Sequence, residues 1–176
     1  MIPITRAALL GAGSAIALVG VPLMTQLVEA ATRAEIDDLA SLNAQIELEN
    51  AGIKAYADAR ATGLLDAPLL TVAGRFASDH LAHREALSAA IFAGGGTPSL
   101  ETATLVYPAF KTKHDVLEFA LSVERKAAST YLSVISDLKD RRLAELVASI
   151  LGVETTHVAL LASALGQVVY ASAFVG

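Results

Sequence analysis

One pair of residues recurs in this chain at a fixed offset, and this duplication constrains the fold more than any other feature. Glu49 is followed seven residues later by Tyr56, and Glu124 is followed seven residues later by Tyr131. Seven residues make about two turns of an α-helix, so each glutamate and its tyrosine lie on one helix face. Because the same interval separates the two glutamates and the two tyrosines, we infer that one structural unit occurs twice.

A second pair of motifs shows the same duplication. His80-x-x-His83 is matched further along the chain by Glu154-x-x-His157, at almost the interval that separates Glu49 from Glu124. Residues three apart share a helix face, so each motif can offer two ligand atoms to one ion. The repeated unit is therefore a pair of helices, and it contains three of the four histidines in the protein. The fourth, His114, lies near a predicted helix start and outside the repeated positions.

Hydrophobic periodicity predicts four long helices. Their approximate ranges are 33–61, 67–93, 113–138 and 141–165. Apolar residues recur along each range at alternating spacings of three and four, as in helices that pack into a bundle. Thr32 with Glu35, and Thr112 with Asp115, form capping boxes at two of the predicted starts. An Ala- and Leu-rich composition with only 5% aromatic residues also favours helices over strands.

The apolar residues at these spacings form a seam along which each helix would pack. Ionisable residues interrupt this apolar seam near the middle of every predicted helix. They are Glu49, His80, His83, Glu124, Glu154 and His157. One buried histidine or glutamate is usually a satisfied core residue, but an unpaired buried charge costs several kcal/mol. The cost of burying six such groups unpaired would exceed the free energy of unfolding of a typical domain, which is about 5–15 kcal/mol. The pattern therefore predicts a metal site, with an extensive internal salt-bridge network as the alternative.

Connection lengths predict the order of the helices. The first and second helices, and the third and fourth, are joined by short segments, so each pair is expected to form an antiparallel hairpin. The segment 93–111 is long for a connection and contains glycine and proline. A crossover that runs the length of the bundle would account for this length, and it would place the hairpins in ferritin-type order.

Taken together, these motifs resemble the ferritin-like di-metal carboxylate superfamily over residues 32–166. That family uses one glutamate from each of two helices and a Glu-x-x-His from each of the other two. By this resemblance, Glu49 and Glu124 are the single glutamates, and Glu154 with His157 is a complete Glu-x-x-His. The resemblance implies an all-α, ferritin-like four-helix bundle, preceded by an apolar N-terminal helix.

His83 matches the second histidine of the family pattern, whereas His80 stands where the family has a glutamate. Three carboxylates and two divalent ions leave a local charge of about +1, where four carboxylates would leave zero. We therefore expect an asymmetric centre with one tightly held ion or two unequal ones. Iron is the first expectation, and manganese, zinc or copper also suit this nitrogen and oxygen ligand set. Similar tyrosines in rubrerythrin-like members hydrogen-bond the ligands, which implies this role for Tyr56 and Tyr131; a satisfied core tyrosine is the alternative.

Residues 1–31 have the character of an export signal or a membrane anchor. Arg6 precedes an uncharged run over residues 7–28, and Val28-Glu29-Ala30 resembles a small-residue cleavage site. The run is also long enough to span a bilayer. Both alternatives place the domain outside the cytoplasm, in the periplasm or its equivalent. Residues 167–176 form an apolar C-terminal tail.

Bulk properties narrow the possible functions. A net charge of −5 argues against nucleic-acid binding, and the absence of cysteine excludes thiolate metal ligands and disulfides. Three functions stay open: redox chemistry of ferroxidase or peroxidase type, a storage cage, and a non-catalytic accessory subunit of an extracytoplasmic membrane complex. Export argues against a storage cage. No residue is assigned to catalysis, and the expected partners are metal ions with a membrane complex or a homo-oligomer.

Overall fold

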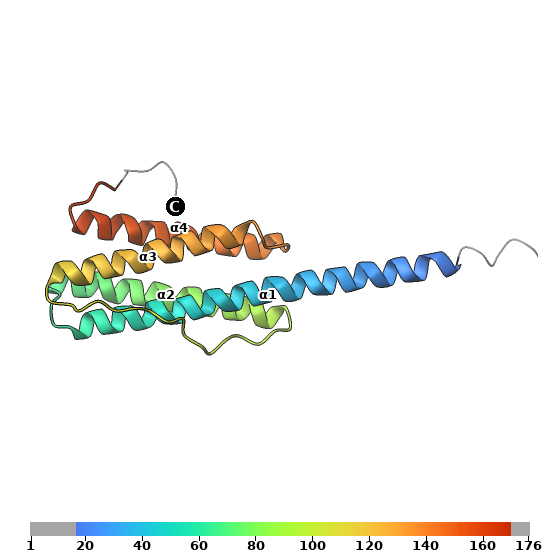
Figure 1. The fold of residues 1–176 in the computed structure, drawn as a ribbon, viewed down its shortest axis with the longest axis horizontal. Helices are drawn as coiled ribbons and strands as arrows, with labels where there is room; N and C mark the ends of the chain where they lie inside the picture. The colour runs from blue at the N-terminus through green and yellow to red at the C-terminus, as the bar shows by residue number, and fades with distance from the viewer. Residues whose placement is uncertain (1–16, 170–176) are drawn as a thin grey trace, which may run out of the picture.

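The computed structural model describes the backbone of residues 17–169 and the side chains of residues 37–169. Within these ranges the chain forms helices and loops without a strand. The helices are α1 (Ala17–Ala61), α2 (Ala67–Ala93), α3 (Lys113–Ile135) and α4 (Arg141–Ala164). α1 packs against α2 and α3 packs against α4 as two antiparallel hairpins (Figure 1). The predicted all-α four-helix bundle is confirmed.

The connection between α2 and α3 runs along the bundle beside α1, as the sequence predicts (Figure 1). Side-chain amides on the outer face of α1 hold it in place. Asn43 accepts a hydrogen bond from the Ser99 amide at 2.7 Å and donates one to the Thr97 carbonyl at 3.1 Å. Asn50 donates to the Glu101 carbonyl at 2.7 Å. Because this connection returns the chain to the far end, α3 runs parallel to α2 and antiparallel to α1 (Figure 1).

The helix ends follow the local signals in three places. Asp66 caps α2 by accepting a hydrogen bond from the Leu69 amide. Thr112 and Asp115 form the predicted capping box at the start of α3. Gly63, just beyond α1, has a φ of 71°, a left-handed conformation that glycine adopts without strain.

Two predicted helix boundaries are wrong. α1 begins at Ala17, so its backbone is helical through the capping box expected at Thr32 and Glu35. The residues just before Thr32 are mostly good helix formers, and they continue the helix across this local start signal. α3 ends at Ile135, three residues before the expected end, because the chain turns at Ser136.

The predicted signal or anchor lies partly outside the described residues, which exclude 1–16. The structure describes only the helical backbone of its remaining part. The apolar tail is described only as far as residue 169. Cleavage, membrane insertion and the packing of the tail therefore stay predictions.

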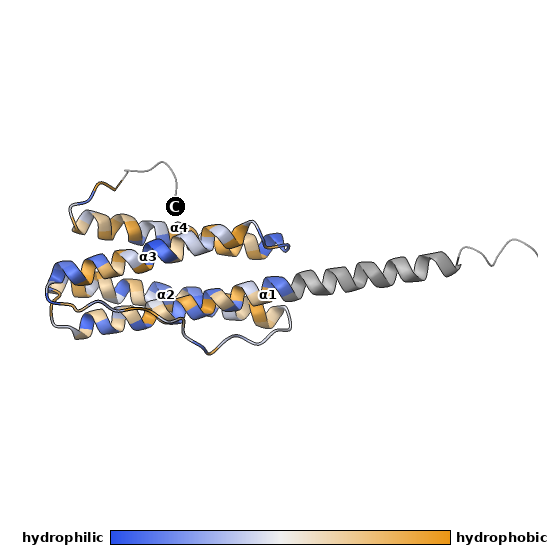
Figure 2. Ribbon diagram, in the orientation of Figure 1, coloured by the Kyte–Doolittle hydropathy of each residue, from blue (hydrophilic) through white to orange (hydrophobic). Residues whose placement is uncertain are grey.

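Apolar side chains form two core clusters with a polar layer between them, and apolar residues follow all four helices in Figure 2. The first cluster contains Phe76, Leu121 and Leu161, and the second contains Ile46, Leu87 and Ile150. On each helix, the ionisable seam residues lie between a residue of the first cluster and one of the second. The six ionisable residues are therefore shielded from water at both ends of the bundle.

Among the described residues, α4 is the one helix with the length and hydropathy of a membrane span. Its middle carries Glu154 and His157, which are both buried among the other helices. We therefore attribute the apolar character of α4 to packing in the bundle core.

Candidate metal centre

The structure brings all six predicted ligands together in the polar layer. Two overlapping groups have ligand atoms within 4.8 Å of one another: Glu49, His80, His83 and Glu154, and His80, Glu124, Glu154 and His157. Every member is buried, and Glu124 and Glu154 are completely inaccessible to solvent. His80 and Glu154 belong to both groups. The two groups therefore form one continuous centre rather than two separate sites.

His80 joins the two single glutamates. Its Nδ1 lies 2.6 Å from Glu49 Oε2, and its Nε2 lies 3.3 Å from Glu124 Oε1. Burial alone would lower the pKa of His80, but hydrogen bonds and charge from Glu124 and Glu49 raise it well above its ordinary value. Burial would raise the pKa of Glu49, but hydrogen bonds from His80 and His83 outweigh burial and lower it. The His80 ring therefore links two carboxylates in this arrangement.

Glu154 has no comparable hydrogen bond. Its Oε1 lies 3.0 Å from His83 Nδ1 and its Oε2 lies 3.5 Å from His157 Nδ1. Both oxygens are buried and lack a partner with hydrogen-bond geometry, as does His83 Nδ1. Burial, and then the neighbouring carboxylate of Glu124, raise the pKa of Glu154. A cation held between Glu154 and these ring nitrogens would satisfy all these atoms, so the donor set fits a transition metal.

The two tyrosines connect the hairpins. Tyr56 on α1 donates a hydrogen bond to Glu124 on α3, and Tyr131 on α3 donates one to Glu49 on α1. Burial and the carboxylate charges, Glu124 beside Tyr56 and Glu49 beside Tyr131, raise the pKa of both hydroxyls well above the usual value. Both hydroxyls therefore stay protonated and orient the glutamate of the opposite hairpin.

Asp79 is a functional candidate that the sequence analysis does not identify. Its Oδ2 lies 3.3 Å from His157 Nε2, and its Oδ1 lies 2.8 Å from Arg75 Nη2. The other ring nitrogen of His157, Nδ1, faces Glu124 and Glu154. A carboxylate behind a histidine ligand fixes the ring orientation and increases its basicity. The sequence feature that could identify Asp79 is its position directly before His80, but Asp79 lies outside the apolar seam on which the other candidates were found.

Asp79 has no counterpart in the second hairpin. Asp79 directly precedes His80, and the residue that directly precedes the matching Glu154 is Val153, which carries no carboxylate. The two histidines of the pattern, His83 and His157, are therefore not equivalent in their surroundings.

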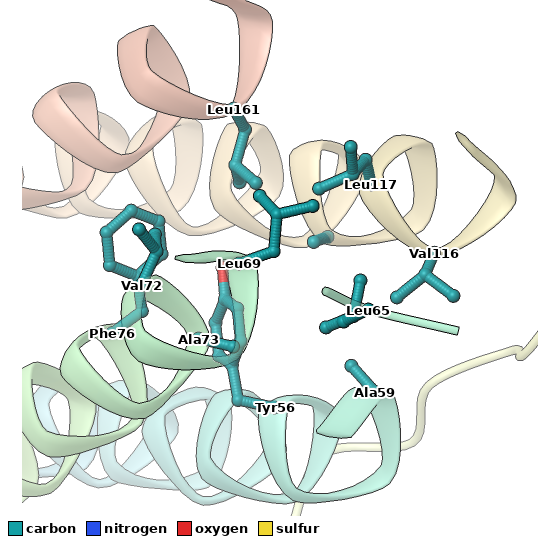
Figure 3. Close-up of a pocket in the computed structure, with 11 residues that line it drawn as sticks. Tyr56, Ala59, Leu65, Leu69, Val72, Ala73, Phe76, Val116, Leu117 and Leu161 are labelled. Carbon is teal, nitrogen blue, oxygen red and sulfur yellow. The ribbon is translucent and has the colours of Figure 1, made fainter. Parts of the chain in front are cut away.

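A small apolar cavity adjoins the polar layer. All four helices contribute to its lining, as Figure 3 shows, and its volume of about 20 Å³ accommodates about one water-sized molecule. Two lining residues connect it to the candidate ligands: Tyr56 bonds Glu124, and the Phe76 ring stacks on His157 with centroids 3.8 Å apart. The cavity is therefore separated from the candidate ligands by one side chain.

The sequence from residue 37 to residue 167 matches the family model of the ferritin-like domain. The chain belongs to the ferritin-like domain family. No curated protein sequence matches it. The family match covers all of the polar layer and the helices that carry it.

Solved structures support the same assignment of the fold. A bacterioferritin from Desulfovibrio desulfuricans, described with a diiron site, is similar with a TM-score of 0.72 and 18% identity over 77% of this chain and 81% of its own. A ferritin-like diiron-carboxylate protein from Bacillus anthracis has a TM-score of 0.62 and 22% identity, over 75% of this chain and 97% of its own. A conserved hypothetical protein from Mycobacterium tuberculosis has a TM-score of 0.66 and 18% identity, over 78% and 96%. This chain therefore has the fold of diiron-carboxylate proteins and carries histidine and glutamate groups able to bind metal.

Proposed function

We propose that this protein binds a transition metal in the polar layer and uses it for redox chemistry of ferroxidase or peroxidase type. The proposed ligands are Glu49, His80, His83, Glu124, Glu154 and His157. Glu154 carries the proposal, because both of its buried oxygens lack a hydrogen bond although three histidines surround them. Burying a carboxylate in this state is costly unless a cation compensates it.

We further propose that the centre holds one ion tightly and a second one weakly. Glu124, Glu154 and His157 supply a complete set at one position, and Asp79 supports this histidine. The other position shares Glu154 and adds Glu49 and His83, but it has His80 in place of a carboxylate. With neutral histidines, three carboxylates and two divalent ions would leave a charge of about +1 in a buried site.

Iron is the proposed metal, because two structural neighbours are described as diiron proteins. Bound iron would supply one-electron redox chemistry and an open position for oxygen or peroxide. Tyr56 and Tyr131 would hold the two single glutamates, and Asp79 would keep Nδ1 of His157 directed into the centre. The apolar clusters exclude water, and the cavity beside Phe76 offers an approach for a small oxidant. Since the chain has no cysteine, its reductant must be another molecule.

Metal analysis and an oxidation assay test this function together. The purified protein should retain about one equivalent of iron per chain and oxidise added Fe(II) with oxygen or peroxide. Glu124→Ala should abolish both properties. His114→Gln is the control, because His114 is the exposed histidine outside the centre and should leave both unchanged. Two equally tight equivalents would contradict the asymmetry, and metal-free protein after iron loading would contradict the function.

Export, with or without membrane anchoring through residues 7–28, stays a proposal from the sequence. An accessory role in an extracytoplasmic membrane complex is the alternative function, and the continuous α1 backbone favours it because it joins residues 17–28 to the bundle. Copurification with a membrane partner, together with bound metal but no turnover, would support this alternative. Gel filtration of the protein would show whether it forms a homo-oligomer.

A further inference from the structure

Gly52 lies one turn after Glu49 on α1, directly against the His80 ring on α2. A Cβ atom at Gly52 would lie 2.9 Å from both Cε1 and Nδ1 of His80, and 3.0 Å from Cδ2. Ring atoms that close to one point mean that the face of the imidazole rests on the glycine. Interiors are packed to near-crystalline density, so an added methyl group here would displace the ring or the helix.

The His80 ring has little freedom to move away. It is 1% exposed, and both of its nitrogens bond glutamates, Glu49 on one side and Glu124 on the other. The Tyr56 ring also stacks on it, with centroids 5.6 Å apart. Displacing the imidazole would therefore lengthen at least one of these contacts.

The internal duplication provides a comparison for this contact within the same chain. Gly52 follows Glu49 by three positions, and the residue that follows the matching Glu124 by three positions is Ala127. The counterpart of His80 in the second hairpin is Glu154. The helix pair that carries a glutamate thus has alanine at the matching sequence position, and the pair that carries an imidazole has glycine. Glycine is unfavourable in a helix interior, so its presence on α1 calls for a specific reason.

We propose that Gly52 is the positioning residue for His80, and that this pair determines how many metal ions the centre holds. Glycine makes room for an imidazole between Glu49 and Glu124, which removes one carboxylate from the shared ligand set. The second hairpin has the alternative combination, Ala127 with Glu154, which keeps the carboxylate. This inference rests on the proposed function for its metal readout, whereas its packing readout is independent of metal.

The packing readout is the thermal unfolding of metal-free protein. Gly52→Ala should lower the Tm by at least about 3 °C in the presence of His80. In the His80→Gln background, whose side chain has the shape of glutamate without its charge, the same change should leave the Tm unchanged or raise it. Gly152→Ala on α4 is the control, since nothing lies within 4 Å of its added Cβ. It should not lower the Tm in either background.

The metal readout is a Co(II) titration followed by visible absorption. The natural chain should bind one ion tightly, and both His80→Glu and Gly52→Ala/His80→Glu should bind two. Gly52→Ala alone should alter the Co(II) spectrum and weaken binding by on the order of tenfold. Restoration of binding by the second substitution would show that alanine is harmful only beside the imidazole.

An equal effect of Gly52→Ala in both backgrounds would overturn the inference, even where metal binding itself is demonstrated. If the effect of Gly52→Ala on the Tm depends on the residue at position 80 but none of the proteins binds Co(II), the proposed function is refuted. The inference that this pair sets the number of metal ions is then refuted with it. If Gly52→Ala is insoluble, recovery of cooperatively folded protein by His80→Glu supports the pair. Failure of this recovery, with His80→Glu alone soluble, overturns it.

Discussion

Replacing Asp79 by asparagine tests whether one of the two metal positions is supported from behind its histidine. Asp79 Oδ2 lies 3.3 Å from His157 Nε2, and Arg75 holds the other oxygen at 2.8 Å. Burial raises the pKa of Asp79, but hydrogen bonds from Arg75 and His157 outweigh it and lower the pKa, so the carboxylate is charged at neutral pH. Asparagine preserves the shape and removes this charge.

The expected loss follows from the geometry. Changes to the hydrogen-bond partner of a metal-bound histidine cost about 10–100-fold in metal affinity. The 3.3 Å separation is longer than that of a strong charge-assisted hydrogen bond, and the Asp79 side chain is 16% exposed. We therefore expect a loss near the lower limit, about tenfold or about 1.4 kcal/mol.

Calorimetric titration of the metal-free protein with Co(II) at neutral pH measures this loss. Asp79→Asn should weaken the tighter binding event and leave the weaker one within about twofold. Asp58→Asn is a matched control, because Asp58 pairs with Lys54 on the surface of α1. Unchanged tight binding in Asp79→Asn, or equal weakening of both events, would refute the assignment of the tight position to His157.

Three further predictions concern the same layer. Tyr56→Phe and Tyr131→Phe should each lower the unfolding free energy of the metal-free protein by about 1–3 kcal/mol, measured by urea denaturation, because a buried glutamate loses its donor. Burial opposes protonation, but Glu154 with Glu49 raises the pKa of His83 to about 9, and Glu124 with Glu154 does the same for His157. These pKa values exceed those of the unfolded chain, so the stability they contribute is complete below about pH 6.5 and disappears as the pH rises through about 9. The Tm of metal-free protein should fall across this interval while that of metal-loaded protein falls less, and a flat profile for the metal-free protein would contradict this. Ala73→Val should fill the apolar cavity and slow oxidation at unchanged metal content; an unchanged rate would show that the oxidant takes another route.

The fold could be predicted from the sequence because its determinants are local. Asp66 and Thr112 cap helices through residues only three positions away, and Gly63 supplies a left-handed turn. The seam pattern and connection lengths then leave few arrangements of four helices. The prediction failed at Thr32, where a local capping signal competes with helix formers on both sides and the helix continues.

The convergence of the ionisable residues was also predictable, because residues at one depth on four packed helices must meet. Their individual contacts were not. That Tyr56 binds Glu124 rather than a group on its own hairpin depends on the distance between α1 and α3. Asp79 and Gly52 lie outside the apolar seam, and their importance depends on rings that other helices bring against them.

The two hairpins differ at the Gly52/His80 pair and at Asp79, and both differences favour the same metal position. Together they argue for an asymmetric centre more strongly than either does alone. His80, which Gly52 accommodates, stands beside Glu49 where the family pattern has a carboxylate. Asp79, which is matched in the second hairpin only by the uncharged Val153, supports the histidine of the opposite position. His80 lies closer to Glu49, at 2.6 Å, than to Glu124, at 3.3 Å, so the first change weakens the Glu49 position more, and the second change strengthens the other position. Their effects on the ratio of the two affinities therefore multiply. Equal affinity at the two metal positions should therefore require changes both at His80 and behind His83. Replacing His80 alone still leaves His83 without a carboxylate like Asp79, which supports His157.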